Sequence, residues 1–243
     1  DLAVVYGLKA RLYMWMEDYA NAQIYARKAI DESGATPTTQ EQWLNATSGF
    51  NDISVSSWMF GSTMQKEDDV VKSGIINWTS WMSNETTYGY AAAGPMPLVD
   101  VNFYNKIADT DFRKLSWKAP AGSALSGKNT YVDEAALPEY ASLKFRPGSG
   151  NTSDFNVGSA CSYPMMRVEE MYFIEAEAVA QQNPAQGVTL LNDFMNNYRD
   201  PQYKCTKSNK DDIVKEIVFQ KRVEFWGEGQ SFFGIKRLNM PQT

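Results

Sequence analysis

Hydrophobic residues at the start of the chain recur with the period of an α-helix. They are Leu2, Val5, Leu8, Leu12 and Trp15. This spacing places all of them on one face, which predicts an amphipathic helix. A turn near Glu17 and Asp18 separates this helix from a second one, which we expect to end at Gly34, because glycine favours the left-handed backbone that stops a helix.

The second helix carries a row of small side chains. Ala22, Ala26 and Ala29 repeat at i, i+4 and i+7, and they leave room for another helix to approach closely. Small residues at fixed places in both helices of a pair are typical of tetratricopeptide-like repeats, and Ala10 and Tyr13 also lie near the spacings of that pattern. We therefore predict a first helical pair within residues 1–47.

A second group of helices is predicted toward the other end of the chain, within residues 161–243. One helix opens after Pro164, a residue suited to the first turn. Its partner covers roughly 184–198, a third helix covers about 210–226, and a short helix follows around 235–236.

The sequence between these groups, residues 48–160, is rich in Gly, Ser, Asn, Thr and Pro, and its helical patterns are brief, as at 101–107. So much irregular sequence in a folded protein is usually functional. The predicted fold class is therefore mostly α. We expect one domain, 1–243, in which tetratricopeptide-like helical pairs carry a long loop-rich insertion, 48–160, that binds the ligand.

Composition narrows the possible functions. The formal net charge is −6, and Lys and Arg are scattered, so we expect no binding to nucleic acid. The sequence contains no histidine, which excludes Ser-His-Asp and Cys-His catalysis and ordinary zinc sites within this chain. No apolar run is long enough to span a bilayer. The pattern leaves open whether Cys161 and Cys205 pair, and two free thiols are expected, because a chain of this length can fold without a bridge.

Two acidic stretches, 67–69 and 109–111, offer oxygen ligands of the kind that calcium prefers. Neither has the spacing of a calcium-binding loop with its glycine turn and final Glu. We interpret both stretches as solvated loops, and we predict no metal and no cofactor.

Two motifs of charged and small residues lie in the late helices. The first motif comprises Pro164, Arg167, Glu169 or Glu170, Tyr172, Glu175, Ala176, Glu177 and Ala178. The second motif comprises Arg222, Glu224, Glu228, Gly229, Lys236 and Arg237. Together they resemble the signatures of the SusD/RagB-like family of Bacteroidetes. The chain departs from the family pattern at Gln220, where the family usually has an acidic residue, and at Gln230, where it usually has arginine. These departures weaken an expected ion network.

The resemblance implies a SusD-like fold and a non-enzymatic function. Members of this family are outward-facing lipoproteins of the outer membrane that capture glycans, or sometimes peptides, and sit as a lid on a SusC-like TonB-dependent transporter. The resemblance also implies that the helices face the transporter while the irregular regions hold the ligand. Family members are considerably longer than this chain, so we expect a truncated chain from which the signal segment and the lipid anchor are absent.

The insertion contains a stretch, 75–91, in which aromatic rings stand among small polar residues. Its candidate ligand-binding residues are Trp78, Trp81, Tyr88, Tyr90, Asn77 and Asn84. An aromatic ring covers the C–H face of a sugar, and amide groups satisfy the hydroxyls around it. We expect one or two of these rings to be exposed. The alternative is that the rings pack the insertion onto the helices.

The charged residues of the two motifs are predicted to form a structural ion network. Its members are Arg167, Glu175, Arg222 and Glu224, with Glu175 and Arg222 as a pair between helices.

Two other functions stay open at this stage. A glycosidase would need two carboxyl groups that flank the scissile bond. The candidates Glu169, Glu170, Glu175 and Glu177 are spread around a single helix. A tetratricopeptide-like scaffold that binds only protein would use a helical face instead of ligand-facing rings.

Overall fold

The computed structural model describes residues 1–240, and its contacts divide the chain into two units. The helical unit comprises Asp1–Pro37, Ser56–Phe60 and the described residues from Met165 onward. The loop-rich unit comprises Thr38–Val55 and Gly61–Pro164. The expected insertion was 48–160, whereas the loop-rich unit begins at Thr38 and ends at Pro164, and the return of Ser56–Phe60 to the helical unit has no signal in the sequence.

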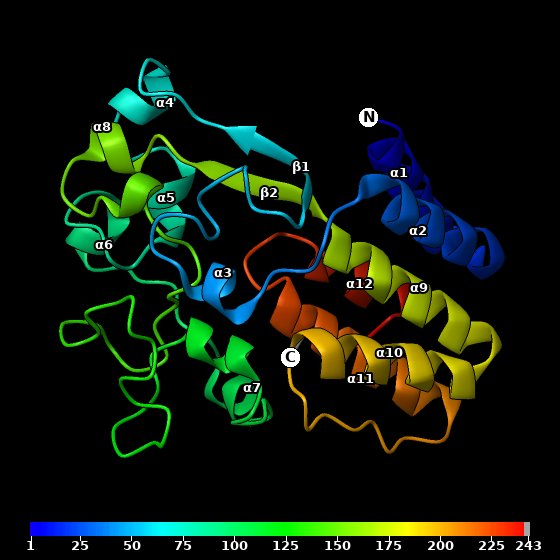
Figure 1. The fold of residues 1–243 in the computed structure, drawn as a ribbon. Coiled ribbons are helices and arrows are strands. Elements are labelled where there is room, and N and C mark those ends of the chain that lie inside the picture. Colours follow the sequence, from blue (N-terminus) through cyan, green and yellow to red (C-terminus); the bar gives the residue numbers. More distant parts are fainter. Residues whose placement is uncertain (241–243) are drawn as a thin grey trace. The chain divides into compact units, whose positions relative to one another are not determined.

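The helical unit consists of long helices that pack side by side (Figure 1). Within the described residues its helices are α1 (Leu2–Trp15), α2 (Tyr19–Ser33), α9 (Val168–Gln182), α10 (Pro184–Tyr198), α11 (Lys210–Glu224) and α12 (Ser231–Arg237). α2 packs against both α1 and α9, and α9 also packs against α10 and α11. The predicted mostly α fold is confirmed.

Local capping explains where these helices begin and end. The side chain of Asp18 accepts a hydrogen bond from the backbone N–H of Asn21 at the start of α2, and Gly34 ends α2 with a φ of 62°. Asn183 caps α10, and Asn209 caps α11. Each cap satisfies a backbone group that has no partner inside the helix, which is why polar residues and glycine mark these ends.

The prediction for Pro164 was wrong. This residue lies in strand β2 (Ser162–Arg167), which pairs with β1 (Trp58–Thr63), and α9 begins only at Val168. A proline suits the first residues of a helix, but pairing with a strand about a hundred residues earlier in the chain decides the local structure here. Such pairing has no local signal.

The hydrophobic stripe predicted on α1 forms, but it does not face the interior. Ala3, Gly7, Ala10 and Met14 are buried instead. A side chain at Gly7 would meet the sulfur of Met166, since an ideal Cβ there lies 2.5 Å from Met166 Sδ. The close approach of α1 to its neighbours therefore selects small residues for the interior and leaves the large ones outside.

The loop-rich unit is built from short elements around aromatic rings. They are α3 (Gln40–Leu44), α4 (Asp69–Lys72), α5 (Trp78–Met82), α6 (Gly89–Ala93), α7 (Val101–Asn105), α8 (Phe155–Gly158) and the 3-10 turns η1 (Phe112–Ser116) and η2 (Gly148–Gly150). The ring of Trp43 packs edge-on against Phe50 at 4.8 Å between centroids, and its Nε1 donates a hydrogen bond to Ser116. Contacts between buried aromatic rings therefore hold this unit together, whereas the helical unit is held together by packing between long helices.

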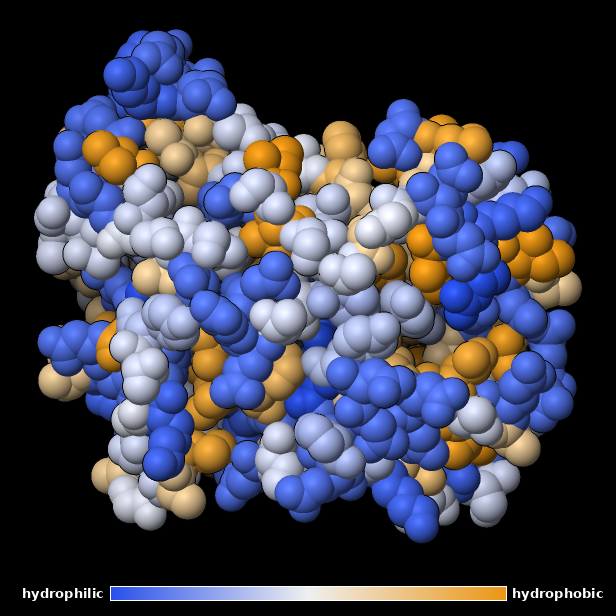
Figure 2. Space-filling view, in the orientation of Figure 1, coloured by the Kyte–Doolittle hydropathy of each residue, from blue (hydrophilic) through white to orange (hydrophobic). Residues whose placement is uncertain are grey.

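The structure also describes the two cysteines and the length of the apolar helices. Cys161 and Cys205 are both buried and free, as expected. Among residues 1–240, no helix is long and apolar enough to cross a membrane. Figure 2 shows hydrophobic residues at the surface over the α1–α2 pair, interspersed with hydrophilic ones.

Candidate functional site

The candidate site lies in the loop-rich unit and begins with helix α5. Asn77 caps this helix, because its side-chain oxygen accepts a hydrogen bond from the backbone N–H of Ser80 at 2.9 Å. The short helix then presents Trp78 and Trp81 three residues apart. The cap therefore fixes the direction in which both rings leave the backbone.

Trp81 presents an exposed ring that packs against the half-buried ring of Tyr90. Trp81 is 55% exposed, and the two ring centroids lie 4.2 Å apart with an angle of 36° between the planes. Gly89 makes this approach possible, since its φ is +66° and an ideal Cβ there would lie 2.2 Å from the Ser80 hydroxyl oxygen. Only glycine fits this position without strain.

A pocket of about 400 Å³ opens beside Trp81. Its lining residues are Met64, Val70, Ile76, Asn77, Trp78, Trp81, Met82 and Tyr163. No Asp, Glu, Lys or Arg belongs to this lining. Ile76 is 61% exposed, so an apolar side chain continues the surface that Trp81 offers. The arrangement suits an uncharged ligand with an apolar face.

Trp78 forms one wall of this pocket and is held by other rings. It stacks on Tyr163 at 5.3 Å between centroids, and it meets Phe145 edge-on at 5.3 Å. Trp78 is half-buried, and its Nε1 is buried without a hydrogen-bond partner within the described residues. Trp78 therefore supports the surface, while Trp81 presents it. Tyr163 was not among the predicted site residues, because only folding brings it to Trp78.

The other predicted ligand contacts are less accessible than Trp81. Tyr88 is half-buried, and burial raises the pKa of its hydroxyl to about 12. Asn84 is buried, and its amide nitrogen donates hydrogen bonds to the carbonyl oxygens of Pro97 and Ser142 at 2.9 and 3.0 Å. These contacts argue against a direct role for Asn84 and Tyr88 in binding. Asn77 lines the pocket, although it is also buried and committed to its cap.

The predicted ion network exists in the helical unit with a different membership. Arg167 donates to Glu224 at 3.1 Å and to Glu228 at 2.9 Å. Arg199 donates to Glu224 at 2.8 Å and to Glu169 at 3.1 Å. The side chains of all five residues are almost completely buried. Arg199 lies outside both motifs, and only the fold brings it to Glu224 and Glu169.

The prediction that Glu175 pairs with Arg222 was wrong. The carboxylate of Glu175 accepts hydrogen bonds from Arg27 of α2, one of them at 3.0 Å to Nε. This follows from packing, because α9 turns the Glu175 side of its surface toward α2. Arg222 instead lines a separate pocket of the helical unit.

The carboxylates of α9 do not form the free pair that a glycosidase needs. Glu169 and Glu177 are fully buried against cations, the latter against Lys221 and Arg237. Glu170 pairs with Arg11, just as Glu175 pairs with Arg27. Each group neutralises a neighbouring cation, which is a structural arrangement.

The acidic stretches at 67–69 and 109–111 were considered above as possible calcium ligands. Within residues 1–240, no three His, Cys, Asp or Glu side chains are arranged to hold a metal ion. Asp111 instead accepts hydrogen bonds from the buried guanidinium of Arg113, one of them at 2.7 Å. Asp109 pairs with Lys114 at 2.7 Å.

Comparison with known proteins places this geometry in context. A model of the SusD family matches residues 15–243. No curated protein sequence matches the chain significantly. Solved structures do match. A SusD-like carbohydrate binding protein from Bacteroides vulgatus is 24% identical, with a TM-score of 0.74, and the match covers 99% of this chain and 46% of that one.

Two further solved structures have the same fold. A SusD superfamily protein from Bacteroides vulgatus has a TM-score of 0.71 at 14% identity, with 98% of this chain and 52% of that chain covered. Surface glycan-binding protein A from Bacteroides thetaiotaomicron has a TM-score of 0.60 at 16% identity, with 98% and 54% covered. The chain thus spans about half the length of these similar structures.

Proposed function

Since this chain belongs to the SusD family, we propose that it is a non-catalytic nutrient-binding protein that captures glycans. One observation carries the proposal: the exposed ring of Trp81, supported by Tyr90, lines a pocket whose lining has no Asp, Glu, Lys or Arg. An exposed ring can cover the C–H face of a sugar and exclude water from it. The similar structures include one named as carbohydrate binding and one named as glycan-binding, which supports the same function.

The proposed mechanism is capture and release. Trp81 stacks on one sugar ring, and the walls formed by Trp78 and Ile76 contact the next. A shallow site leaves much of the ligand in water, so we expect a Kd of about 10 μM to 1 mM. Weak binding at each site lets a glycan pass on. We propose that it passes to a SusC-like TonB-dependent transporter in the outer membrane, where the whole protein faces outward on a lipid anchor.

Isothermal titration calorimetry of the chain against a panel of soluble ligands tests the proposal. The panel contains neutral oligosaccharides from starch, laminarin, xylan and levan, together with mixed oligopeptides. The test variant carries Trp81→Ala and Tyr90→Ala. The matched control is Phe232→Ala, which removes an exposed ring from the helical unit. Circular dichroism confirms that each variant is folded.

We expect one class of oligosaccharide to bind the parent chain and the control, and to lose at least about tenfold in affinity in the double variant, as stacking contacts of this size imply. A glycan that binds the double variant as tightly as the parent chain would remove the site from this surface. Binding of oligopeptides alone would replace glycans as the ligand class. No binding by any panel member would favour the scaffold alternative.

A further inference from the structure

The loop-rich unit keeps much of its positive charge in its interior. Four of its nine cationic side chains are buried: Arg113, Lys114, Lys144 and Arg146. Packing occupies each of them. Arg113 and Lys114 donate hydrogen bonds to carboxylates of their own segment, and Arg146 pairs with a neighbouring glutamate. The ammonium group of Lys144 lies over the ring of Phe50, 4.7 Å from its centroid. These cations are therefore withheld from any ligand at the surface.

The acidic side chains of the same unit lie mostly outside. Eight carboxylates of this unit are exposed, among them those of Glu67, Asp69 and Asp154. Only four exposed cations stand against them, Lys66, Lys72, Lys106 and Lys128. A ligand that approaches the unit therefore meets a surface with an excess of negative charge, and like charges weaken an encounter.

The same imbalance exists beside the pocket at Trp81. Two lining residues, Met64 and Val70, flank a segment that contains three consecutive carboxylates, 67–69. The ammonium groups of Lys66 and Lys72 lie 3.8 and 3.6 Å from carboxylates of this run. Three acidic groups and two basic ones leave this border negative.

The polar groups of the lining itself are neutral. Trp81 brings an indole N–H, and Tyr163, which stacks on Trp78, brings a phenol hydroxyl. Such groups exchange hydrogen bonds with the hydroxyls of a neutral sugar. They do not compensate the charge of a carboxylate or sulfate that leaves water, and an anion without a counter-charge is costly to bury.

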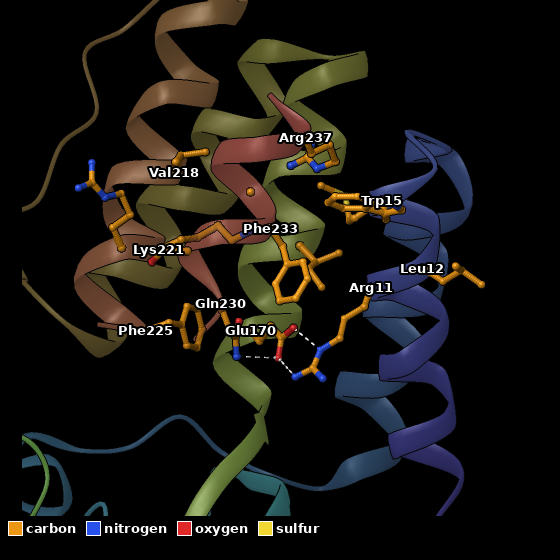
Figure 3. A pocket seen from close by; sticks show the side chains of 15 residues that line it. Arg11, Leu12, Trp15, Glu170, Val218, Lys221, Phe225, Gln230, Phe233 and Arg237 are labelled. Carbon is orange, nitrogen blue, oxygen red and sulfur yellow. Dashed lines mark hydrogen bonds and ion pairs between the residues drawn. The ribbon is translucent and has the colours of Figure 1, made fainter. Parts of the chain in front are cut away.

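The helical unit has a pocket of a different character. This pocket has a volume of about 470 Å³, and its lining includes Arg11, Lys221 and Arg237 (Figure 3). All three cations already have carboxylate partners, Arg11 in Glu170 and the other two in Glu177. Cations thus reach a pocket of this protein, but these three are neutralised there.

We propose that the binding site of the loop-rich unit selects glycans built from neutral sugars and rejects those that carry carboxylates or sulfates. The inference rests on the proposed function, glycan capture at Trp81, and narrows its substrate class. Rejection has two physical sources. An anion that enters the pocket loses water without gaining a cation, and the carboxylates at 67–69 repel it. Specificity of this kind comes from what the site disfavours as much as from what it binds.

Isothermal titration calorimetry with matched ligands tests the proposal. Hexasaccharides of starch, laminarin and levan are used in three forms: unmodified, oxidised to carboxylates at their free primary alcohols, and converted from carboxylate to carboxamide. Xylohexaose is compared with the same chain bearing glucuronic acid or glucuronamide. We expect the carboxylate form of a bound glycan to lose at least about tenfold in affinity. The carboxamide, which has the same size but no charge, should bind within about threefold of the unmodified form.

A cation placed in the pocket should reverse the selection. Val70→Lys adds an ammonium group to the lining. The matched control, Val101→Lys, makes the same change at an exposed position of α7 that does not line this pocket. We expect Val70→Lys to bind the carboxylate form at least about fivefold more tightly than the parent chain, and the control to stay within about twofold of it. Circular dichroism confirms that both variants are folded.

The possible failures can be told apart. Carboxylate forms that bind as tightly as the unmodified glycan, or more tightly, would overturn the inference and leave glycan capture intact. A carboxamide as weak as the carboxylate would overturn it as well, because the lost hydroxyl would then explain the loss. If no form of any hexasaccharide binds, the proposed function itself is refuted, and the inference is refuted with it.

Discussion

At the scale of single residues, buried charge organises the helical unit. Glu224 lies between Arg167 and Arg199 and accepts hydrogen bonds from both. Such a cluster is weak evidence for stability, since burying the charges costs about as much as their attraction returns. Removing one member is different, because it leaves the opposite charge buried without compensation.

We therefore predict that Glu224→Gln lowers the free energy of unfolding by about 3 kcal/mol. The amide keeps the shape of the carboxylate but not its charge, so Arg167 and Arg199 each lose one buried anionic partner and depend on Glu169, which both of them also contact. Urea denaturation followed by far-UV circular dichroism measures the change. The control is Lys215→Gln, which removes an exposed cation 4.0 Å from Asp212 and should change stability by less than about 0.5 kcal/mol. Equal midpoints for both variants would refute the argument.

The contribution of Glu177 to the stability of the fold is expected to depend on pH. Burial alone would raise the pKa of its carboxyl, but Lys221 and Arg237 together hold that pKa below the ordinary value of 4.5. A carboxyl whose pKa is lower in the folded state stabilises the fold above its unfolded pKa, and this contribution disappears as the pH falls through the folded pKa. The ion pairs of Glu177 therefore act at neutral pH and weaken in acid.

The predicted effect of Glu177→Gln depends on pH in the same sense. At pH 7 the variant is less stable than the parent chain, because Lys221 and Arg237 lose their partner. The difference should shrink as the pH is lowered well below 4.5, where the parent carboxyl also becomes neutral. Urea denaturation at a series of pH values measures it. A difference that is constant with pH would show that Glu177 acts through packing alone.

At the scale of elements, close approach between helices depends on missing side chains. Gly187 of α10 faces Ala180 of α9, and an ideal Cβ at Gly187 would lie 2.6 Å from Ala180 Cα and 2.8 Å from its backbone nitrogen. Backbone atoms cannot move aside as a flexible side chain can. Gly234 of α12 is a useful contrast, since a Cβ there would have no neighbour within 4 Å.

We predict opposite effects for the same substitution at these two sites. Gly187→Ala should lower the free energy of unfolding by about 1–2 kcal/mol, because overpacking outweighs the gain in helix propensity. Gly234→Ala should raise it by up to about 1 kcal/mol through propensity alone. Urea midpoints measured by circular dichroism compare the two. A stabilising Gly187→Ala would mean that α9 and α10 separate easily.

The elements also show what the sequence could predict. Helix ends marked by Gly34, Pro184 and Asn209 were placed well, because a cap acts within a few residues of its own position. The outward face of α1 could not be anticipated, since periodicity reveals a face without naming its neighbour. The strand at Pro164 escaped notice for the same reason: its partner, β1, is distant in sequence.

At the scale of the whole molecule, the candidate site also depends on contacts between segments that are distant in sequence. Trp78 and Trp81 have the same chemistry and lie three residues apart, yet one is a half-buried wall and the other an exposed surface. Phe145 and Tyr163 decide which is which, and both come from far along the chain. The sequence could therefore single out a stretch of aromatic rings among polar residues, but only the fold shows which ring is exposed.

The two cysteines report separately on the two units. Cys161 belongs to the loop-rich unit and Cys205 to the helical unit. Burial raises the pKa of both thiols, and both side chains are shielded from solvent. Because the thiolate is the reactive form, low exposure and a raised pKa both slow the reaction of a thiol.

We predict that both thiols of the native chain react with a maleimide at least about a hundredfold more slowly than in urea, because reaction requires local or global opening. Mass spectrometry resolves the two sites in one experiment. As urea is added, each thiol becomes reactive when its own unit opens, so coincident midpoints mean one cooperative unfolding and separate midpoints mean two. Fast labelling of Cys161 without urea would contradict the ring-packed interior of the loop-rich unit. Fast labelling of Cys205 would contradict the tightly packed helices, and the stability changes predicted for Glu224→Gln and Gly187→Ala would then have to be measured against a partly open state.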